Sequence, residues 1–145
     1  MAVDLAGRTA KGSDGGFTLV ELLVVIMILG ILATISITVL LRQQEKGWDA
    51  AVSSDLRNAA GVQHAVLAGT DPNRFASTIG ELSAAGFRSS DAKNYFGGAA
   101  AITVSAVDST SYCMTARSGS GKFFSMSSQA GLRIGASAFD PGTCD

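Results

Sequence analysis

An uncharged run of 20 residues near the N-terminus constrains this chain more than any other feature of its sequence. The run extends from Leu22 to Leu41 and reads LLVVIMILGILATISITVLL. At a rise of about 1.5 Å per residue it would form a helix of roughly 30 Å, the thickness of a bilayer's hydrocarbon core. Apolar side chains at successive positions leave no polar face. The run therefore predicts a membrane-spanning helix rather than the core helix of a soluble domain.

The remaining composition leaves room for one small domain beside this helix. The chain has 145 residues and a net charge of −1, with no basic excess that would favour nucleic-acid binding. Positive charges flank the run evenly, with Arg8 and Lys11 before it and Arg42 and Lys46 after it. Charge alone therefore does not fix the orientation of the helix in the membrane.

A single carboxylate lies directly before the uncharged run, one turn into the predicted apolar helix. Glu21 belongs to the string Gly16-Phe17-Thr18-Leu19-Val20-Glu21. A charged side chain costs about 2.5–3.5 kcal/mol at the centre of a membrane helix, and less near the interface. Spacing alone leaves two interpretations of Glu21 open. It is either a functional residue or an interfacial side chain that marks the helix start, where a negative charge suits the helix dipole.

The string GFTLVELLVVIMILGILA, residues 16–33, resembles the class III signal of type IV prepilins and the related pseudopilins. This resemblance implies a cytoplasmic leader, residues 1–16, which a prepilin peptidase removes by cutting between Gly16 and Phe17. It also implies N-methylation of Phe17 and an assembly role for Glu21. The rest of the chain would then lie outside the cytoplasm.

The chain departs from the family pattern in two respects. Its leader contains Asp4 and Asp14, and is longer and less basic than the shortest leaders of the family. Many pilins have a helix-kinking proline in the apolar segment, whereas the prolines here are Pro72 and Pro141. Gly30 remains either a weak point in the helix or a close-packing site together with Thr34.

The helical pattern continues beyond the membrane segment as an amphipathic stripe. Apolar residues recur at steps of three and four, the spacing of one helix face: Trp48, Val52, Leu56, Ala59, Val62 and Val66. Polar residues between them suit a solvated face: Asp49, Asp55, Arg57 and Gln63. One helix is thus predicted from residue 17 to about residue 68, ended by Gly69 and Pro72. Residues 17–41 form its transmembrane half and residues 42–69 its amphipathic half.

Residues 70–145 are predicted to form a globular head with an antiparallel sheet. Residues 78–86 have the capping-box spacing and terminal glycine of a short helix. After Asn94 the apolar period changes to two, which predicts three strands, around 102–106, 112–116 and 124–126, or four if 132–134 forms a last one. The apolar face of this sheet needs a cover, and the stripe on the long helix can supply it. The predicted class is α+β, and the resemblance implies a pilin fold.

The head offers no recognisable catalytic chemistry. Residues 118–123 resemble a phosphate-binding loop only superficially, because Ala116 and Phe123 occupy positions that need Gly and Ser or Thr, so a hairpin turn is predicted. The lone His64 is interpreted as a structural or surface residue. No metal, cofactor or enzymatic activity is predicted. Cys113 and Cys144 are compatible with one disulfide, and the resemblance implies that they close a C-terminal loop.

The resemblance implies a structural subunit that polymerises through its N-terminal helix into a type IV pilus. Its partners would be other copies of itself, prepilin peptidase, the inner-membrane assembly machinery and, before assembly, the lipid bilayer. It would begin as a single-pass precursor in the cytoplasmic membrane and end in an extracellular filament. Two alternatives remain: a minor pilin or pseudopilin of a type II secretion or DNA-uptake system, and a monomeric bitopic membrane protein with a binding head.

Overall fold

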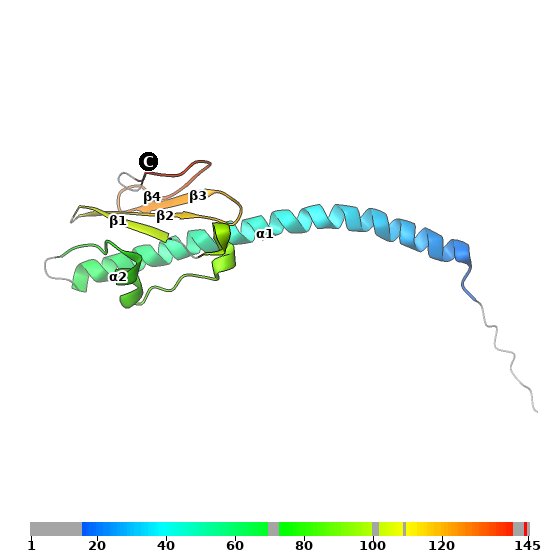
Figure 1. Ribbon diagram of the computed structural model, residues 1–145, viewed down its shortest axis with the longest axis horizontal. Helices are drawn as coiled ribbons and strands as arrows, with labels where there is room; N and C mark the ends of the chain where they lie inside the picture. Colours follow the sequence, from blue (N-terminus) through cyan, green and yellow to red (C-terminus); the bar gives the residue numbers. More distant parts are fainter. Residues whose placement is uncertain (1–15, 70–72, 100–101, 109, 141–143, 145) are drawn as a thin grey trace, which may run out of the picture. The chain divides into compact units, whose positions relative to one another are not determined.

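The computed structural model describes residues 16–69, 73–99, 102–108, 110–140 and 144, and places two helices and a four-stranded sheet (Figure 1). Residues 1–15 of the predicted leader, Pro72 and Pro141 fall outside the described residues. The elements follow one another as helix α1 (Leu19–Gly69), helix α2 (Ile79–Ala84), the short 3₁₀ turns η1 (Ala92–Asn94) and η2 (Phe96–Gly98), and strands β1 (Ile102–Asp108), β2 (Ser111–Arg117), β3 (Phe123–Ser127) and β4 (Gly131–Gly135). The predicted α+β class is confirmed.

The chain divides into two compact units, residues 1–38 and 39–145. In the first unit, the described part of α1 keeps its apolar side chains exposed from Leu19 onward. By length and composition, α1 contains a stretch that could cross a membrane, and none of that stretch is buried inside the protein. The first unit therefore has no core of its own among the described residues.

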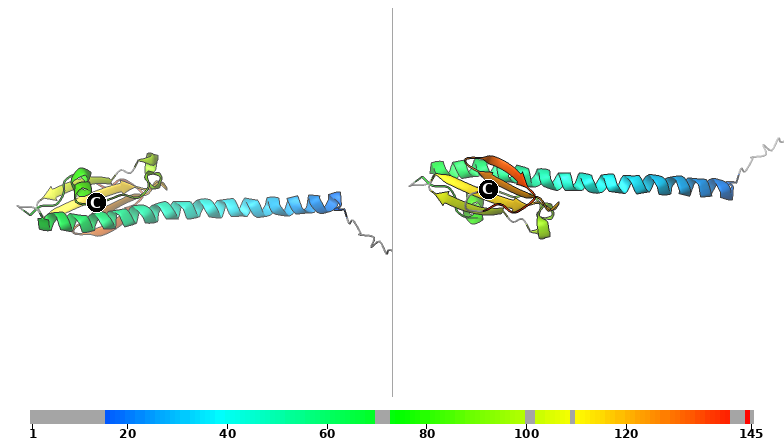
Figure 2. Two further views of the ribbon diagram at one scale, coloured as in Figure 1. Left: turned by 90° about the horizontal axis from the view of Figure 1, so that it is seen from below. Right: turned by 90° about the horizontal axis from the view of Figure 1, so that it is seen from above.

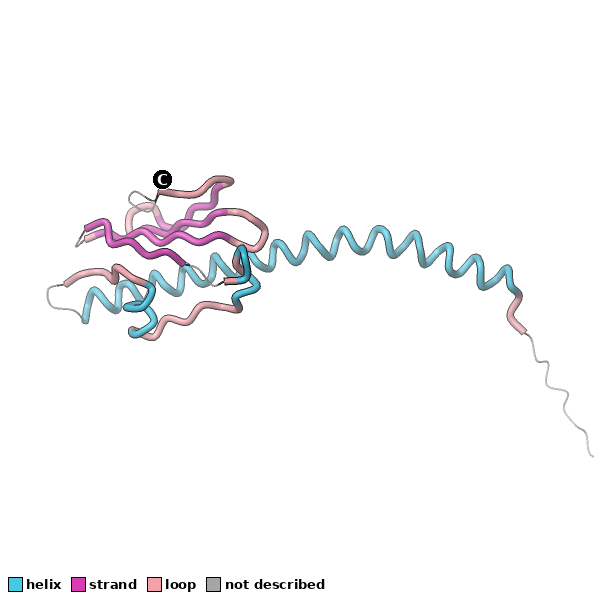
Figure 3. Tube along the Cα trace, viewed as in Figure 1, coloured by secondary structure: helices cyan, strands magenta, loops and turns pink. Residues whose placement is uncertain are grey.

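The second unit has a sheet packed on residues of the C-terminal half of α1 (Figure 2). The sheet is an antiparallel meander in the order β1-β2-β3-β4 (Figure 3). Alternate residues of β2 and β3 point to the face of the sheet that packs on α1. On this face Met114 pairs with Met126, and Ala116 pairs with Phe124. The core joins this face to α1, α2 and the loops between: Val52, Leu56, Ala59, Phe75, Leu82, Phe87, Tyr112, Met114, Phe124 and Met126.

The amphipathic stripe is confirmed, but the predicted solvent exposure of its polar neighbours is wrong for two residues. Val52, Leu56 and Ala59 are fully buried. Asp55 and Gln63, predicted to be solvated, are buried as well. They are covered because the connection between α1 and the sheet folds back over that side of the helix and supplies hydrogen-bond partners for both side chains.

These partners are specific. The Gln63 amide pairs with both backbone groups of Ala76, accepting from its N–H at 2.8 Å and donating to its carbonyl at 3.1 Å. Asp55 Oδ2 accepts from the N–H and Oγ of Ser90, at 2.8 and 2.7 Å, and from the Tyr95 hydroxyl at 2.5 Å. Burial and the neighbouring Asp55 carboxylate raise the pKa of Tyr95 well above its ordinary value. The hydroxyl therefore stays protonated and donates to Asp55.

Helix α2 has the predicted caps. The Thr78 hydroxyl accepts from the N–H of Glu81 at 3.2 Å, and the Glu81 carboxylate accepts from the N–H of Ser77 at 2.8 Å. The helix ends at Gly86, whose φ of 103° is disfavoured for residues that carry a Cβ. The bond from Phe87 N–H to the Leu82 carbonyl, 2.9 Å, closes a Schellman motif. The head therefore begins with a short helix whose two ends are both satisfied.

Candidate assembly and processing site

The predicted junction between leader and helix, at Gly16 and Phe17, is exposed. Gly16 and Phe17 precede α1 in non-helical conformation, and the Phe17 side chain is 82% exposed. The carbonyl of Thr18 accepts the N–H of Leu22 at 3.3 Å, so Thr18 is the N-cap residue that directly precedes α1. The bond between residues 16 and 17, where cleavage is predicted, is thus outside the hydrogen-bonded helix.

Thr18 and Glu21 form a capping box at this helix start. The Thr18 hydroxyl accepts from the N–H of Glu21 at 3.2 Å. Glu21 Oε2 in turn accepts from the N–H of Thr18 at 3.0 Å and from its hydroxyl at 3.1 Å. This reciprocal arrangement satisfies two backbone donors that a helix start leaves without helical partners. It holds the Glu21 carboxylate next to the backbone that follows Phe17.

The participation of Thr18 was missed in the sequence, although its signal was present. A threonine three residues before a glutamate, directly ahead of an apolar run, is the capping-box pattern. The same pattern was recognised at Thr78 and Glu81 in the head.

The hydroxyl side chains in the apolar segment bond to their own helix. Thr34 donates to the Gly30 carbonyl at 2.9 Å, Ser36 to the Leu32 carbonyl at 2.8 Å and Thr38 to the Ile35 carbonyl at 2.9 Å. Each hydroxyl hydrogen is therefore satisfied without water, as a membrane or an apolar bundle requires. At Gly30 a Cβ atom would meet nothing within 4 Å in the described structure, so its role in close packing stays a prediction.

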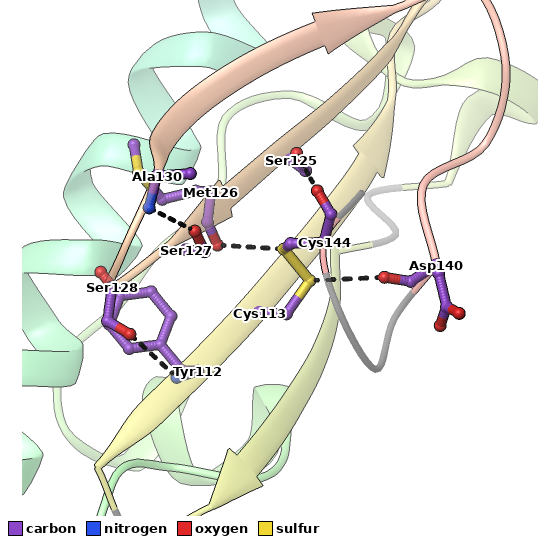
Figure 4. Close-up of a disulfide and its surroundings, with 9 residues drawn as sticks. All are labelled: Tyr112, Cys113, Ser125, Met126, Ser127, Ser128, Ala130, Asp140 and Cys144. Atoms are coloured by element: carbon purple, nitrogen blue, oxygen red, sulfur yellow. Dashed lines mark hydrogen bonds between the residues drawn. A yellow bond between two sulfur atoms is a disulfide. The ribbon is translucent and has the colours of Figure 1, made fainter.

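A disulfide joins Cys113 of β2 to Cys144 at the end of the chain, with Cα atoms 5.6 Å apart (Figure 4). Cys113 alternates with Tyr112 and Met114, which face the core, so the bond lies on the opposite face of the sheet. The Ser125 hydroxyl donates to the Cys144 carbonyl at 3.5 Å, and both residues are buried. The disulfide thus fixes the C-terminal tail across the outer face of the sheet.

The 118–122 segment is a turn, as predicted. Ser118 N–H donates to the Lys122 carbonyl at 2.9 Å, and Lys122 Nζ lies 2.6 Å from Asp49 Oδ2. Ser120 also donates to Asp49. Burial tends to raise the pKa of the Asp49 carboxyl, but the hydrogen bonds from Lys122 and Ser120 outweigh it and lower the pKa overall. These interactions tie the β2–β3 turn to α1.

The remaining candidates for chemistry do not converge. His64 is exposed, and its ring meets the edges of Phe75 and Tyr112 with centroid distances of 5.9 and 6.2 Å. Among the described residues, no three His, Cys, Asp or Glu side chains are grouped so that they could hold a metal ion. The structure thus places His64 in an aromatic cluster at the surface of the head.

Fold and site together define a class of protein: a long apolar helix with a capped carboxylate at its start, carrying a small disulfide-closed α+β head. The family model described as the prokaryotic N-terminal methylation motif matches residues 11–37. The chain is also 34% identical over 109 residues to the type IV wide pilus major component PilA4 of Thermus thermophilus, covering 75% of this chain and 74% of that protein. No solved structure matches the chain. The chain belongs to the type IV pilin family, whose members are structural proteins.

Proposed function

We propose that this pilin is the structural subunit of a type IV pilus and polymerises through its N-terminal helix. The observation that carries the proposal is the contrast along α1. Its first 20 residues expose an apolar surface in which Glu21 is the one charged residue, whereas the head buries its own core. Such a helix needs an apolar environment, which the bilayer supplies to the precursor and neighbouring helices supply in a filament. Similarity to a protein named as a major pilus component favours the main subunit over a minor one.

The proposed division of the chain follows from this role. Residues 1–16 form a cytoplasmic leader, and prepilin peptidase cuts between Gly16 and Phe17. Residues 17–41 anchor the precursor in the cytoplasmic membrane and later form the centre of the filament. Residues 42–69 support the head, residues 70–145, which lies outside the cytoplasm. The amine exposed at Phe17 is then N-methylated.

Glu21 has the assembly role in this proposal. Cleavage creates a cation at the Phe17 amine, one helical turn from the Glu21 carboxylate. In a staggered bundle of helices, the carboxylate of one subunit pairs with the amine of a neighbour. Charges in an apolar bundle require such partners, because an unpaired buried charge is strongly destabilising. The capping hydrogen bonds from Thr18 support the proposal, since they hold the carboxylate at the helix start.

Intact-mass and N-terminal analysis of sheared cell-surface material tests the proposal. We expect an abundant protein that begins at Phe17 and carries one N-methyl group. The matched control is the membrane fraction of a strain without prepilin peptidase, in which the chain should keep its leader. Filament protein that still begins at Met1 would contradict the proposal. Trace amounts in abundant filaments would instead indicate a minor pilin or a pseudopilin.

A further inference from the structure

One end of the head is fixed beside the residues of α1 that follow the apolar run. The ring of Trp48 packs on the β2–β3 turn, where a Cβ at Gly119 would lie 3.1 Å from two of its atoms. Asp49, next on the helix, binds Ser120 and Lys122 of the same turn. The other end of the sheet lies farther along α1, since Tyr112 at the start of β2 meets His64. We call the end at Trp48 the proximal end of the head.

The 3₁₀ turns η1 and η2 adjoin the β2–β3 turn at the proximal end. Gly119 N–H donates to the Asn94 carbonyl at 2.8 Å, and Tyr95 forms a bridge with Ser118. Figure 1 shows these turns and the β2–β3 connection together at one end of the head. The tertiary contacts therefore hold both loops at the level of Trp48.

An aromatic residue is exposed at this end and is stacked on a cation. The Phe96 side chain is 53% exposed. The guanidinium carbon of Arg117 lies 3.5 Å from the centre of the Phe96 ring and 4.9 Å from that of Phe123. Such stacking is attractive, since the ring faces carry partial negative charge. It fixes the ring of Phe96 at the surface of the head, although burial in a core would be the usual place for a phenylalanine.

Cations outnumber carboxylates in the loops of the proximal end and on the adjoining turns of α1 taken together. The cations at the proximal end and on the adjoining turns of α1 are Arg42, Lys46, Lys93, Arg117 and Lys122. The carboxylates there are Glu45, Asp49 and Asp91. Lys93 is paired with Asp91 at 3.1 Å and is 73% exposed, so its charge still faces solvent. The proximal end thus combines exposed aromatic area with a net positive charge.

Along α1, the proximal end of the head lies only a few residues beyond the end of the apolar run. The apolar run stops at Leu41, and the rise from Arg42 to Trp48 is about 9 Å. The headgroup layer extends roughly 5–8 Å beyond the hydrocarbon on each side of a bilayer. A modest tilt of the helix would bring the proximal end into this layer. Helices that lie in a membrane interface likewise combine Lys and Arg with Trp, Phe or Leu side chains.

We infer that the proximal end of the head rests on anionic phospholipid headgroups while the subunit is held in the membrane. Phe96 enters the headgroup layer, and Lys93, Arg117 and Lys122 face its phosphates. The contact holds the head against the bilayer until the subunit is extracted into a filament. This inference rests on the proposed membrane-anchored precursor.

Tryptophan fluorescence of the full chain in vesicles tests the contact, because Trp48 is the only tryptophan in the sequence. One variant combines Trp48→Phe with Phe96→Trp, which keeps an aromatic ring under Arg117. The control combines Trp48→Phe with Gln129→Trp, in the exposed β3–β4 turn at the other end of the sheet. Vesicles contain phosphatidylcholine alone or mixed with phosphatidylglycerol, with a quencher attached near the lipid headgroup.

We expect quenching in the Phe96→Trp variant and little in the Gln129→Trp control, with the difference greatest in phosphatidylglycerol vesicles. Raising the salt from 0.1 M to 1 M shortens the Debye length from about 10 Å to about 3 Å and should reduce the difference. Adding Lys93→Glu to the Phe96→Trp variant should also reduce it. Adding Arg57→Glu, an exposed cation farther along α1, should leave it unchanged.

Alkaline extraction of the same vesicles distinguishes failure of the proposed membrane-anchored subunit from failure of the lipid contact. A chain that washes off the vesicles would count against the proposed membrane-anchored subunit. A chain that stays inserted while both tryptophans remain equally unquenched would overturn only the lipid contact. If the tryptophan of the Phe96→Trp variant becomes shielded in assembled filaments but never in vesicles, a neighbouring subunit covers the proximal end and the lipid contact is wrong.

Discussion

The two halves of α1 belong to one helix but have opposite environments. Between Leu22 and Leu41 the large apolar side chains are about half exposed or more, whereas Val52, Leu56 and Ala59 are 0% exposed. The more hydrophobic half is thus the one without a core. The head thus buries a core of its own, whereas none of the described residues covers the apolar N-terminal half, which we propose is covered by lipid or by neighbouring helices.

The polar groups of the two halves differ in the same way. In the apolar half, the Ser and Thr hydroxyls bond to carbonyls three or four residues earlier in the same helix. In the head half, Asp55 and Gln63 bond to segments far away in the sequence. No buried side-chain nitrogen or oxygen lacks a partner in the described residues. Substitutions in the head should therefore alter the stability of the single chain, whereas substitutions in the apolar half should alter its assembly.

The largest expected effect concerns Glu21. We expect Glu21→Val to abolish filament formation while leaving membrane insertion and the head unchanged. Loss of one partner of a desolvated ion pair costs about 3–5 kcal/mol, and the loss would recur with each added subunit. The measurement compares the amounts of membrane-bound subunit and of sheared filament when the variant is the only copy.

Glu45→Val is the matched control for Glu21→Val. Glu45 is an exposed glutamate on the same helix, beyond the apolar run. Its substitution should leave filament yield near that of the unmodified chain. Normal yield from Glu21→Val would show that the carboxylate only marks the helix start, which was the second interpretation of its position in the sequence.

The disulfide should have the next largest effect, and it should act on the head alone. Cys113 and Cys144 are 31 residues apart in sequence. Closing such a loop stabilises a fold by about 3–4 kcal/mol in the chain-entropy model. We expect the double variant Cys113→Ser/Cys144→Ser to lose stability of this order in denaturant unfolding of the detergent-solubilised chain.

Helicity of the apolar segment should not change in the double variant, because both cysteines lie in the head. Reduction of the unmodified chain is the parallel measurement, since it breaks the same bond without a substitution. An unfolding midpoint that is unaffected by both treatments would show that the tail contributes little to the head.

The buried hydrogen bond from Tyr95 to Asp55 should have a smaller effect. We expect Tyr95→Phe to lower the free energy of unfolding by about 1.5–3 kcal/mol, the range for hydrogen bonds to charged groups. The ring stays in place, and Asp55 keeps its two bonds from Ser90. Denaturant unfolding measures the change.

Tyr112→Phe supplies the matched control for Tyr95→Phe. Tyr112 is a second buried tyrosine of the core, and burial alone raises its pKa. Its hydroxyl has no carboxylate partner among the described contacts, so its removal should cost less. Equal losses from the two substitutions would show that the bond to Asp55 adds nothing beyond packing.

The parts of the fold that the sequence predicted are those encoded by local patterns. The apolar run, the alternation from Ile102 onward and the caps of α2 each depend on residues within a few positions of one another. The burial of Asp55 and Gln63 depends on partners 35–40 and 13 positions away, which no local pattern contains. Interspersed polar residues therefore suggested a solvated face that the folded chain covers.

The candidate site was predictable to a different degree. Its residues could be named from the resemblance, and the disulfide between Cys113 and Cys144 is confirmed by the structure. The capping role of Thr18 was also predictable, because a threonine three residues before a glutamate is the capping-box pattern. Cleavage after Gly16, methylation of Phe17 and the assembly role of Glu21 stay predictions, because they depend on an enzyme and on other subunits rather than on the fold of one chain.

The smallest expected effect concerns a surface ion pair of the head and its dependence on pH. Arg74 and Glu81 form two hydrogen bonds of 3.1 and 3.0 Å. The Arg74 guanidinium, followed by the N–H of Ser77, lowers the pKa of Glu81 from 4.5 to about 2. Since the folded pKa lies below the unfolded one, the ionised carboxylate stabilises the head above about pH 4.5. This contribution is lost as the pH falls from about 4.5 to about 2.

We therefore expect Glu81→Gln to lower the melting temperature of the head slightly at pH 7, with the difference disappearing toward pH 2. The amide oxygen can still accept from Ser77 and keep the cap of α2 in place, whereas the charge and one of the two bonds from Arg74 are lost. The effect should be small because the pair is solvent-exposed and screened. Arg74→Gln is the matched variant, and in its background Glu81→Gln should change the melting temperature less. A difference that persists at pH 2 would assign the effect to the shape of the cap rather than to ionisation of Glu81.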